Sequence, residues 1–463
     1  MEKAIIAIGV CILIYFAVLW LGYLIFLVSS FTNIIKKYQE STYSEHIMAF
    51  YNHTILPPIT IIMPAYNESK RIMNAITAIR NSDYKNIHLI VVNDGSTDKT
   101  LQLLIDEFSL KKTSCLSNRV RKTGKVIAYY TSDTIANFIV IDKEHSPYAN
   151  SAADCINAGL NICQTPLFIT IDSDTILEKT ALSHMLFMYF THAHCVAIGG
   201  DIYVPDATKI SSDGKLSQTN IPPSLLLGVQ VCEYLRSFLY GREGWSFLGG
   251  SLSFPGAFTL FETQAVQDFG GFDSSNFAYD AEIIMNLHHE MRRRKYPYSV
   301  IYAPSAIAWA ESPNTLKLFW IQRNHWQRGL LRSLSRHKNM VFNPKYGITG
   351  LIAFPYYILF EIFGPVVESI AYITLILTFF FSQISLSLLA WLIFLAWSYI
   401  TFITMSCVLL STLTYNKYYT KLDILRILSL TTIDMFFFRQ YRAFCALLGT
   451  FHYLFNRLRG KPQ

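Results

Sequence analysis

The stretch Leu167-Phe-Ile-Thr-Ile-Asp-Ser-Asp174 decides the fold. Five largely apolar, partly β-branched residues run directly into two carboxylates, which predicts a buried parallel strand that ends at an open sheet edge. Ligands of open α/β sheets bind beyond the carboxyl ends of such strands. On an extended backbone Asp172 and Asp174 point the same way, so the pair can hold a hard divalent cation against a diphosphate. The alternative is a helix cap, because a helix-like run starts at Glu178.

The same alternation of strand and helix patterns extends on both sides of this stretch. Further strands are predicted, each over a mostly apolar run, within 59–68, 87–98, 135–142, 195–203 and 254–261. Helical patterns follow most of them, so the sequence predicts an α/β domain whose mostly parallel sheet carries helices on both faces. Residues 109–134 are polar and irregular and are predicted to form a surface excursion, and residues 205–221 a loop.

Composition indicates membrane spans. The chain has 463 residues, too many for one ordinary core, and 52% of them are apolar while only 15% are charged. Residues 4–31 carry no charge, and about 20 apolar residues suffice to cross a bilayer. This segment is longer than the apolar core of a signal peptide, so it is predicted to be a retained anchor. Lys36 and Lys37 follow it, which places this end in the cytoplasm by the positive-inside rule.

A second apolar region runs from Gly347 to about Leu413 and predicts two spans, roughly 355–381 and 386–412. Glu361 and Glu368 are costly at membrane depth unless each faces a partner or a polar path. After it, four charged residues between 425 and 450 favour an amphipathic interfacial helix over a fourth span. The predicted organisation is an anchor (1–35), an α/β domain (57–310), an interface helix (311–346), a transmembrane hairpin (347–415) and an amphipathic basic tail (416–463).

Six motifs occur in one order along the chain: Pro64-Ala-Tyr-Asn-Glu68, Val92-Asn-Asp-Gly-Ser-Thr-Asp98, Asp172-Ser-Asp174, Gly256-Ala-Phe258, Tyr279-Asp280 and Gln322-Arg-Asn-His-Trp326. This ordered set resembles the membrane-embedded family 2 glycosyltransferases, the group of the cellulose, chitin, hyaluronan and poly-N-acetylglucosamine synthases. The resemblance covers about residues 57–330 and the flanking spans. It implies a GT-A-like α/β fold that binds a nucleotide sugar.

The resemblance also implies a donor site for a UDP-sugar. Asp94 would accept a hydrogen bond from the uracil imide, and Asp172 would lie near the ribose and diphosphate. Asp174 would bind Mg²⁺ or Mn²⁺ between the phosphates, because the departing diphosphate develops negative charge. The remaining implied nucleotide-sugar contacts are Pro64, Ala65, Tyr66 and Glu68.

On the acceptor side, the resemblance implies that Asp280 is the base that takes the proton from the acceptor hydroxyl. A single base opposite the leaving group implies inversion at the anomeric carbon. Gln322, Arg323 and His325 would contact the diphosphate or the acceptor, and Trp326 would offer a flat face to a sugar ring. The alternative for Trp326 is an interfacial anchor, a role typical of Trp at headgroup level.

Three positions depart from the family pattern. Tyr279 stands where a Glu is usual, His325 where an Arg is usual, and Ser151-Ala152 where many members carry Gly-Lys. A histidine is only partly charged near neutral pH, so His325 weakens neutralisation of the diphosphate unless Arg323 or Arg328 compensates. The departures favour an unusual acceptor or product over lost activity.

The expected function is that of an inverting transferase of the inner or plasma membrane, multi-pass with a cytoplasmic catalytic domain, that extends a β-linked polysaccharide from a UDP-sugar. A single transfer to a lipid carrier or glycolipid and a decayed partner subunit of a synthase are the alternatives. The net charge of +7 fits anionic lipids and an anionic donor, and no nucleic-acid-binding motif occurs. A homo-oligomer or an export partner stays open, because three spans are few for polymer export. The eight cysteines show no metal spacing.

Overall fold

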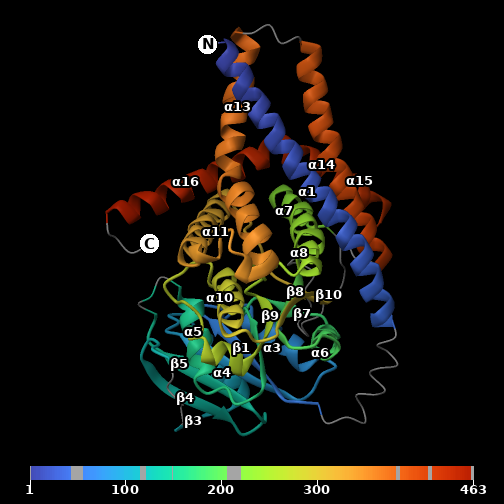
Figure 1. Ribbon diagram of the computed structural model, residues 1–463. Coiled ribbons are helices and arrows are strands. Elements are labelled where there is room, and N and C mark those ends of the chain that lie inside the picture. The colour runs from blue at the N-terminus through green and yellow to red at the C-terminus, as the bar shows by residue number, and fades with distance from the viewer. Residues whose placement is uncertain are drawn as a thin grey trace.

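The computed structural model describes residues 2–42, 56–114, 121–146, 148, 150–205, 221–381, 386–414 and 420–459. The molecule has three levels along one axis (Figure 1): a sheet domain, a middle level of helices, and a column of long apolar helices. The loop predicted over residues 205–221 lies almost wholly outside the described residues. The described cysteines form no disulfide among themselves, since all seven are free thiols.

Ten strands form one sheet in the order β3-β4-β5-β2-β1-β6-β9-β8-β10-β7. Neighbours β5, β2, β1 and β6 run parallel, as do β8 and β10, whereas β9 is antiparallel to both β6 and β8. The predicted α/β class with a mostly parallel sheet is therefore confirmed. The strands are β1 (Ile59–Ala65), β2 (Ile87–Asp94), β3 (Leu110–Thr113), β4 (Val126–Ser132), β5 (Phe138–Lys143), β6 (Leu167–Ile171), β7 (Ile176–Leu177), β8 (Cys195–Tyr203), β9 (Phe258–Glu262) and β10 (Ser299–Trp309).

The prediction of an irregular excursion over 109–134 is wrong in part, because β3 and β4 extend the sheet there by antiparallel pairing. Their polar composition suits a sheet edge, where exposed lysines such as Lys111 and Lys112 oppose further pairing. The strand β10 was not predicted. It is nearly all buried beside β8, but Pro304 interrupts its apolar run and hides the pattern.

Strand β8 runs through Gly199 and Gly200. A Cβ atom at Gly199 would lie 2.5 Å from the ring of Phe254, and one at Gly200 would lie 2.2 Å from Phe258. The glycines are therefore needed because two aromatic rings pack directly against the strand backbone.

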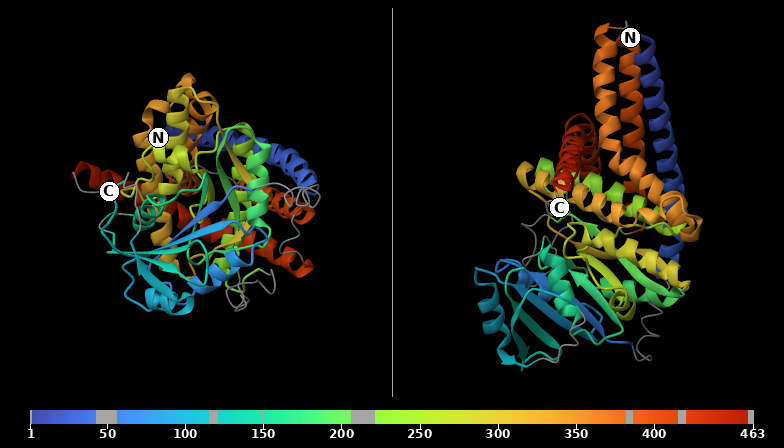
Figure 2. Two further views of the ribbon diagram at one scale, coloured as in Figure 1. Left: turned by 90° about the horizontal axis from the view of Figure 1, so that it is seen from below. Right: turned by 60° about the vertical axis from the view of Figure 1, so that its left-hand side comes forward.

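Helices cover the sheet and form the middle level of the molecule, seen from two further sides in Figure 2. Helix α5 packs on β1 and β2, and α6 packs on β10. The helices of the domain are α3 (Ile72–Arg80), α4 (Thr100–Phe108), α5 (Ser151–Leu160), α6 (Ala181–Thr191), α7 (Leu225–Tyr234), the π-helix η2 (Leu235–Arg242), α8 (Glu243–Leu248), α9 (Thr263–Asp268), α10 (Tyr279–Arg294) and α11 (Leu316–Arg336).

Within the described residues, two helices are long and apolar enough to cross a membrane: α1 (Glu2–Thr42) and α14 (Leu386–Thr414). A bent pair, 349–362 followed by 364–380 at 43°, makes a third if it counts as one span. It comprises η5 (Thr349–Ala353), α12 (Phe354–Tyr356), η6 (Tyr357–Ile362) and α13 (Gly364–Phe381). Two short 3₁₀ turns, η3 (Lys338–Met340) and η4 (Pro344–Tyr346), lead into it. The helices α1, α13 and α14 stand side by side in the column of Figure 2.

Polar contacts join the column to the sheet domain. Lys37 of α1 donates to Glu243 of α8 at 2.8 Å and to the carbonyl of Tyr302 in β10 at 2.9 Å. In the tail, Arg439 donates to Glu368 of α13 at 2.7 Å, which supplies the partner that a carboxylate at membrane depth requires.

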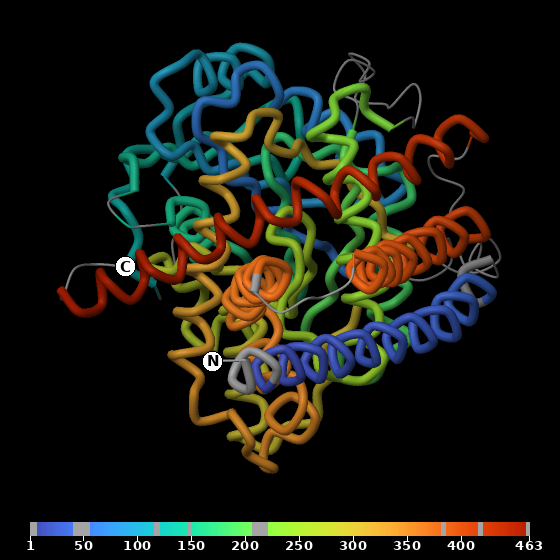
Figure 3. The backbone as a smooth tube through the Cα atoms, turned by 90° about the horizontal axis from the view of Figure 1, so that it is seen from above, coloured from blue at the N-terminus to red at the C-terminus, as the bar shows by residue number. Residues whose placement is uncertain are grey.

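The tail forms α15 (Lys421–Ile433), the π-helix η7 (Asp434–Phe438) and α16 (Arg439–Leu458). Figure 3 shows the tail helices running past α14 and α13, which contact α15 and α16 respectively. One face of α16 contacts α11, where Gln327 donates to Thr450 at 3.1 Å. The opposite face leaves Phe444, Phe451 and Phe455 more than half exposed. The helix is therefore amphipathic, and its polar face is occupied by protein.

Candidate active site

A cavity of about 250 Å³ opens at the carboxyl ends of β1, β2 and β6. The three strands are neighbours in the sheet, so the residues that follow them meet at one edge. The cavity is lined by Pro64, Ala65, Tyr66, Glu68, Asp94, Ser151, Ala152, Cys155, Asp172, Ser173 and Asp174. Every residue predicted to bind the nucleotide sugar or the metal therefore lies on one cavity.

Asp94, the predicted uracil acceptor, is held by a buried lysine that sequence reasoning missed. Lys143 pairs with Asp94 and, at 2.9 Å, with Asp154, and both the lysine and Asp154 have no exposed side-chain surface. The backbone amide of Ser146 donates to Asp94 at 3.1 Å. The available signal was positional, because Lys143 ends β5 and stands in register opposite Asp94 on the adjacent strand.

An aromatic pair lies beside this carboxylate. The rings of Tyr66 and His145 are 4.5 Å apart and inclined by 30°. The Nδ1 atom of His145 lies 2.7 Å from Asp94, and its side chain is 53% exposed. A flat, open surface next to a hydrogen-bonding carboxylate suits a nucleobase, which offers a π-face and an imide together. Only the Tyr66 half of this pair was predicted.

Asp172 and Asp174 follow β6 and form a buried pair of carboxyl groups. Burial raises the pKa of Asp172, and the nearby Asp280 and Glu68 raise it further. Burial and Asp172 likewise raise the pKa of Asp174, although Arg71 opposes the shift. The described residues hold no cluster of three or more metal-ligating side chains. One or two carboxylates completed by phosphate oxygens are what Mg²⁺ typically uses, so the residues present fit a divalent ion bound together with a diphosphate.

Asp280, the predicted base, lies in the first turn of α10 and accepts from the backbone amide of Ala281 at 2.9 Å. Burial raises the pKa of Asp280, and Arg242 of η2 opposes that shift. The neighbouring Tyr279 is buried in the hydrophobic core, with its hydroxyl against the backbone of Gly256. The first turn of α10 keeps two carboxylates, Asp280 and Glu282, and Glu282 is paired with His337 and Arg336.

Helix α11 carries the motif 322–326. The guanidinium of Arg323 lies 4.1 Å from the ring centre of Trp326 and donates to Glu233 at 2.9 Å. Trp326 is 44% exposed, so one face is covered by Arg323 and only the other can serve a sugar or the membrane. The Oε1 atom of Gln322 is buried without a hydrogen-bond partner among the described residues.

His325 stacks on Phe277, with the ring centres 4.5 Å apart and the planes inclined by 2°. Burial, and then Arg328, lower the pKa of His325. The histidine is therefore neutral at physiological pH, in line with the loss of charge inferred from the sequence. Arg328 stands 4.6 Å from the centre of the same Phe277 ring.

Comparison with known proteins gives matches over both halves of this site. Residues 60–132 match the family model described as "Glycosyl transferase family 2", and residues 234–449 match "Glycosyl transferase family group 2". The chain is a family 2 glycosyltransferase. The resemblance found from the motifs is thereby confirmed.

Curated relatives of this family 2 glycosyltransferase include two poly-beta-1,6-N-acetyl-D-glucosamine synthases. The protein from Staphylococcus epidermidis is 21% identical over 291 residues, and that from Staphylococcus aureus (strain COL) is 23% identical over the same length. Each match covers 63% of this chain and 59% of the relative. The chain thus matches about three fifths of the length of these relatives.

A solved structure supports the fold of this family 2 glycosyltransferase. The mannosyltransferase PcManGT from Pyrobaculum calidifontis, in complex with GDP-Man and Mn²⁺, has a TM-score of 0.52 and 15% sequence identity. The match covers 89% of this chain and 98% of that chain. It supports the predicted GT-A-like architecture.

Proposed function

We propose that this protein is an inverting membrane glycosyltransferase that transfers a sugar from a UDP-sugar to a growing β-linked polysaccharide. The observation that carries the proposal is the single cavity lined by Asp94, Asp172 and Asp174, with Asp280 close enough to act electrostatically on Asp172. Because the curated relatives make poly-N-acetylglucosamine, UDP-N-acetylglucosamine is the first donor to test.

Each part of the site has a separate task in this proposal. Asp94, aligned by Lys143, accepts from the base imide, and the Tyr66–His145 pair stacks against the base. A divalent cation, Mg²⁺ or Mn²⁺, held by Asp174 would neutralise charge on the departing diphosphate. Asp280 takes the proton from the acceptor hydroxyl while the hydroxyl oxygen bonds to the anomeric carbon and the bond from that carbon to the diphosphate breaks. Attack opposite the leaving group inverts the carbon.

The interface side is assigned to the acceptor and the membrane. Gln322 and Arg323 contact the diphosphate or the acceptor, and the open face of Trp326 stacks on a sugar ring. The exposed phenylalanines of α16 enter the lipid headgroup region. The catalytic domain lies in the cytoplasm of an inner or plasma membrane, because Lys36 and Lys37 stand at the domain end of α1.

The deciding experiment is UDP release by the purified full chain in nanodiscs, with a panel of UDP-sugars and Mg²⁺ or Mn²⁺. Metal-dependent release with one donor, reduced about 10²–10⁴-fold in Asp280→Asn, would support the proposal. The matched control is Asp268→Asn, an exposed carboxylate on α9. Binding of UDP without release from any donor would reject a stand-alone enzyme and favour a decayed subunit. Product length on a gel separates polymer extension from a single transfer to lipid.

A further inference from the structure

A largely buried cluster of five charged residues connects the motif helix to the C-terminal tail; we call it the arginine network. Its members are Glu233, Arg236, Arg323, Asp434 and Arg442. One carboxylate oxygen of Glu233 accepts from Arg323 at 2.9 Å and from Arg442 at 3.2 Å. Arg442 also donates to Asp434 at 3.1 Å, and Arg236 donates to Asp434 at 2.6 Å.

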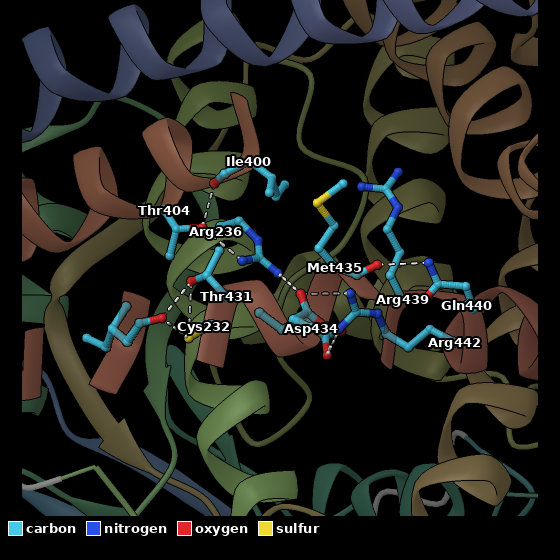
Figure 4. A network of polar contacts seen from close by, with 12 residues as sticks. Cys232, Arg236, Ile400, Thr404, Thr431, Asp434, Met435, Arg439, Gln440 and Arg442 are labelled. Atoms are coloured by element: carbon cyan, nitrogen blue, oxygen red, sulfur yellow. Dashed lines mark hydrogen bonds and ion pairs between the residues drawn. The ribbon is translucent and has the colours of Figure 1, made fainter. Parts of the chain in front are cut away.

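The network joins segments far apart in the sequence. Figure 4 shows Arg236 of η2 between Asp434 of the tail and Thr404, which accepts from Arg236 at 2.9 Å. Thr404 belongs to α14, one of the long apolar helices. Arg323 belongs to α11 and is two residues from His325, where the family's usual arginine is missing. A membrane helix and the tail thus both reach the motif helix through charged contacts.

The charges in the network do not balance. Although burial opposes ionisation, Arg442 and Arg236 lower the pKa of Asp434, so this carboxylate stays charged. Three guanidinium groups therefore face two carboxylates, which leaves one positive charge in excess. The Nε and Nη1 atoms of Arg323 are buried and have no hydrogen-bond partner among the described residues. A buried cation with free donors is costly unless an anion completes it.

The aromatic neighbours of Arg323 orient its free donors. Its guanidinium lies 4.6 Å from the ring centre of Phe319 and 4.1 Å from that of Trp326. With Nη2 tied to Glu233, the plane of the guanidinium has little freedom to turn. Arg442 donates to the same carboxylate oxygen of Glu233. The single negative charge of Glu233 is therefore shared between two guanidinium groups and does not fully neutralise Arg323.

We propose that Arg442 of the tail is a positioning residue, which shares Glu233 and so keeps the charge of Arg323 available to the diphosphate of the sugar nucleotide. The inference rests on the proposed function, because it assigns that anion as the ligand. It makes the tail part of the substrate-binding machinery and gives this chain a replacement for the guanidinium absent at His325.

The test measures the dissociation constant of UDP with Mg²⁺ or Mn²⁺ and the KM and kcat for the donor, using the full chain in nanodiscs. In Arg442→Gln, Glu233 pairs with Arg323 only and neutralises its charge. We therefore expect UDP affinity to fall and KM to rise about tenfold, with a smaller change in kcat. Arg442→Lys keeps the charge and should recover most of the affinity. Glu233→Gln removes the competing carboxylate and should shift UDP affinity in the opposite direction, toward tighter binding.

The matched control is Tyr453→Phe, which removes a 3.1 Å hydrogen bond to Ser335 at the same α11–α16 contact without touching the network. Melting temperature is recorded for every variant. The proposal is overturned if Arg442→Gln binds UDP like Tyr453→Phe, or if Arg442→Gln and Glu233→Gln weaken binding alike, as loss of packing would. Failure of the wild type to release UDP would reject the proposed function only, since the UDP affinities still test the role of Arg442.

Discussion

The two halves of the candidate active site are built in different ways. In the nucleotide half, Asp94 and Asp172 follow strands that lie on either side of β1, so sheet register alone brings them together. In the acceptor half, Asp280 and Arg323 stand on α10 and α11, two helices that contact each other, and α11 also contacts α7 and α16. The first half rests on backbone pairing, and the second rests on side-chain charges and on segments up to 209 residues apart.

The two halves are therefore sensitive to different substitutions. A backbone-built site tolerates substitution around it but not loss of the charge balance within it, because its carboxylates are buried. A site built from helix contacts can be altered from a distance, by changes in residues that never meet the substrate.

Lys143→Met should have the largest effect. It leaves the buried carboxylates of Asp94 and Asp154 without their shared cation, so the free energy of unfolding should fall by about 3–5 kcal/mol. UDP binding should weaken as well, because Asp94 loses its alignment. Denaturant unfolding and UDP titration measure the two effects. Lys125→Met, which removes an exposed ion pair with Glu144, is the control and should leave both unchanged. Equal stability of the two variants would contradict the role given to Lys143.

Asp174→Asn tests whether Asp174 binds the divalent cation in the nucleotide cavity. Without this carboxylate, metal-dependent UDP release should fall on the order of a hundredfold or more. The variant should also melt at a higher temperature than the wild type when metal is absent, because two crowded carboxylates have become one. Added Mg²⁺ or Mn²⁺ should stabilise the wild type and leave the variant unchanged. A variant that is still stabilised by metal would place the ion elsewhere.

The pH dependence of the rate examines Asp280. Its pKa is raised by burial, and a base works only when ionised, so kcat should fall as the pH drops through that raised value. The fall should be about tenfold per pH unit and should begin above the ordinary aspartate pKa of about 3.9. Melting temperatures taken at each pH separate loss of ionisation from loss of fold. An acidic limb at the ordinary aspartate value would mean that water reaches Asp280 freely.

Trp326 should give the smallest effect and decides between its two roles. If its open face stacks on a sugar, Trp326→Ala should raise the KM for the acceptor about threefold to tenfold, and Trp326→Phe should restore most of the loss. Trp391→Ala, an exposed tryptophan on α14, is the control. If Trp326 is only an interfacial anchor, its substitution should resemble that of Trp391 and leave the acceptor KM alone.

Much of the nucleotide half could be predicted from sequence because its signals are local. An apolar run that ends in a carboxylate marks a strand and its functional end at once, as at Leu167–Asp174 and at Ile87–Asp94. No local pattern indicates the role of Lys143, because its partners, Asp94 and Asp154, lie on a neighbouring strand and a helix. The strand β10 was not predicted from the sequence, because a proline interrupts its apolar pattern.

The α/β class, the long apolar helices and the seven predicted residues that line the nucleotide cavity follow from the sequence, because periodicity and strand ends are properties of short stretches. Only the tertiary structure decided that Arg323 is held by Glu233 and Arg442, that His325 stacks on a ring, and that the tail contacts the motif helix. The physical reason is that such contacts depend on how helices pack in three dimensions, and no local pattern records which distant charge a buried arginine will meet.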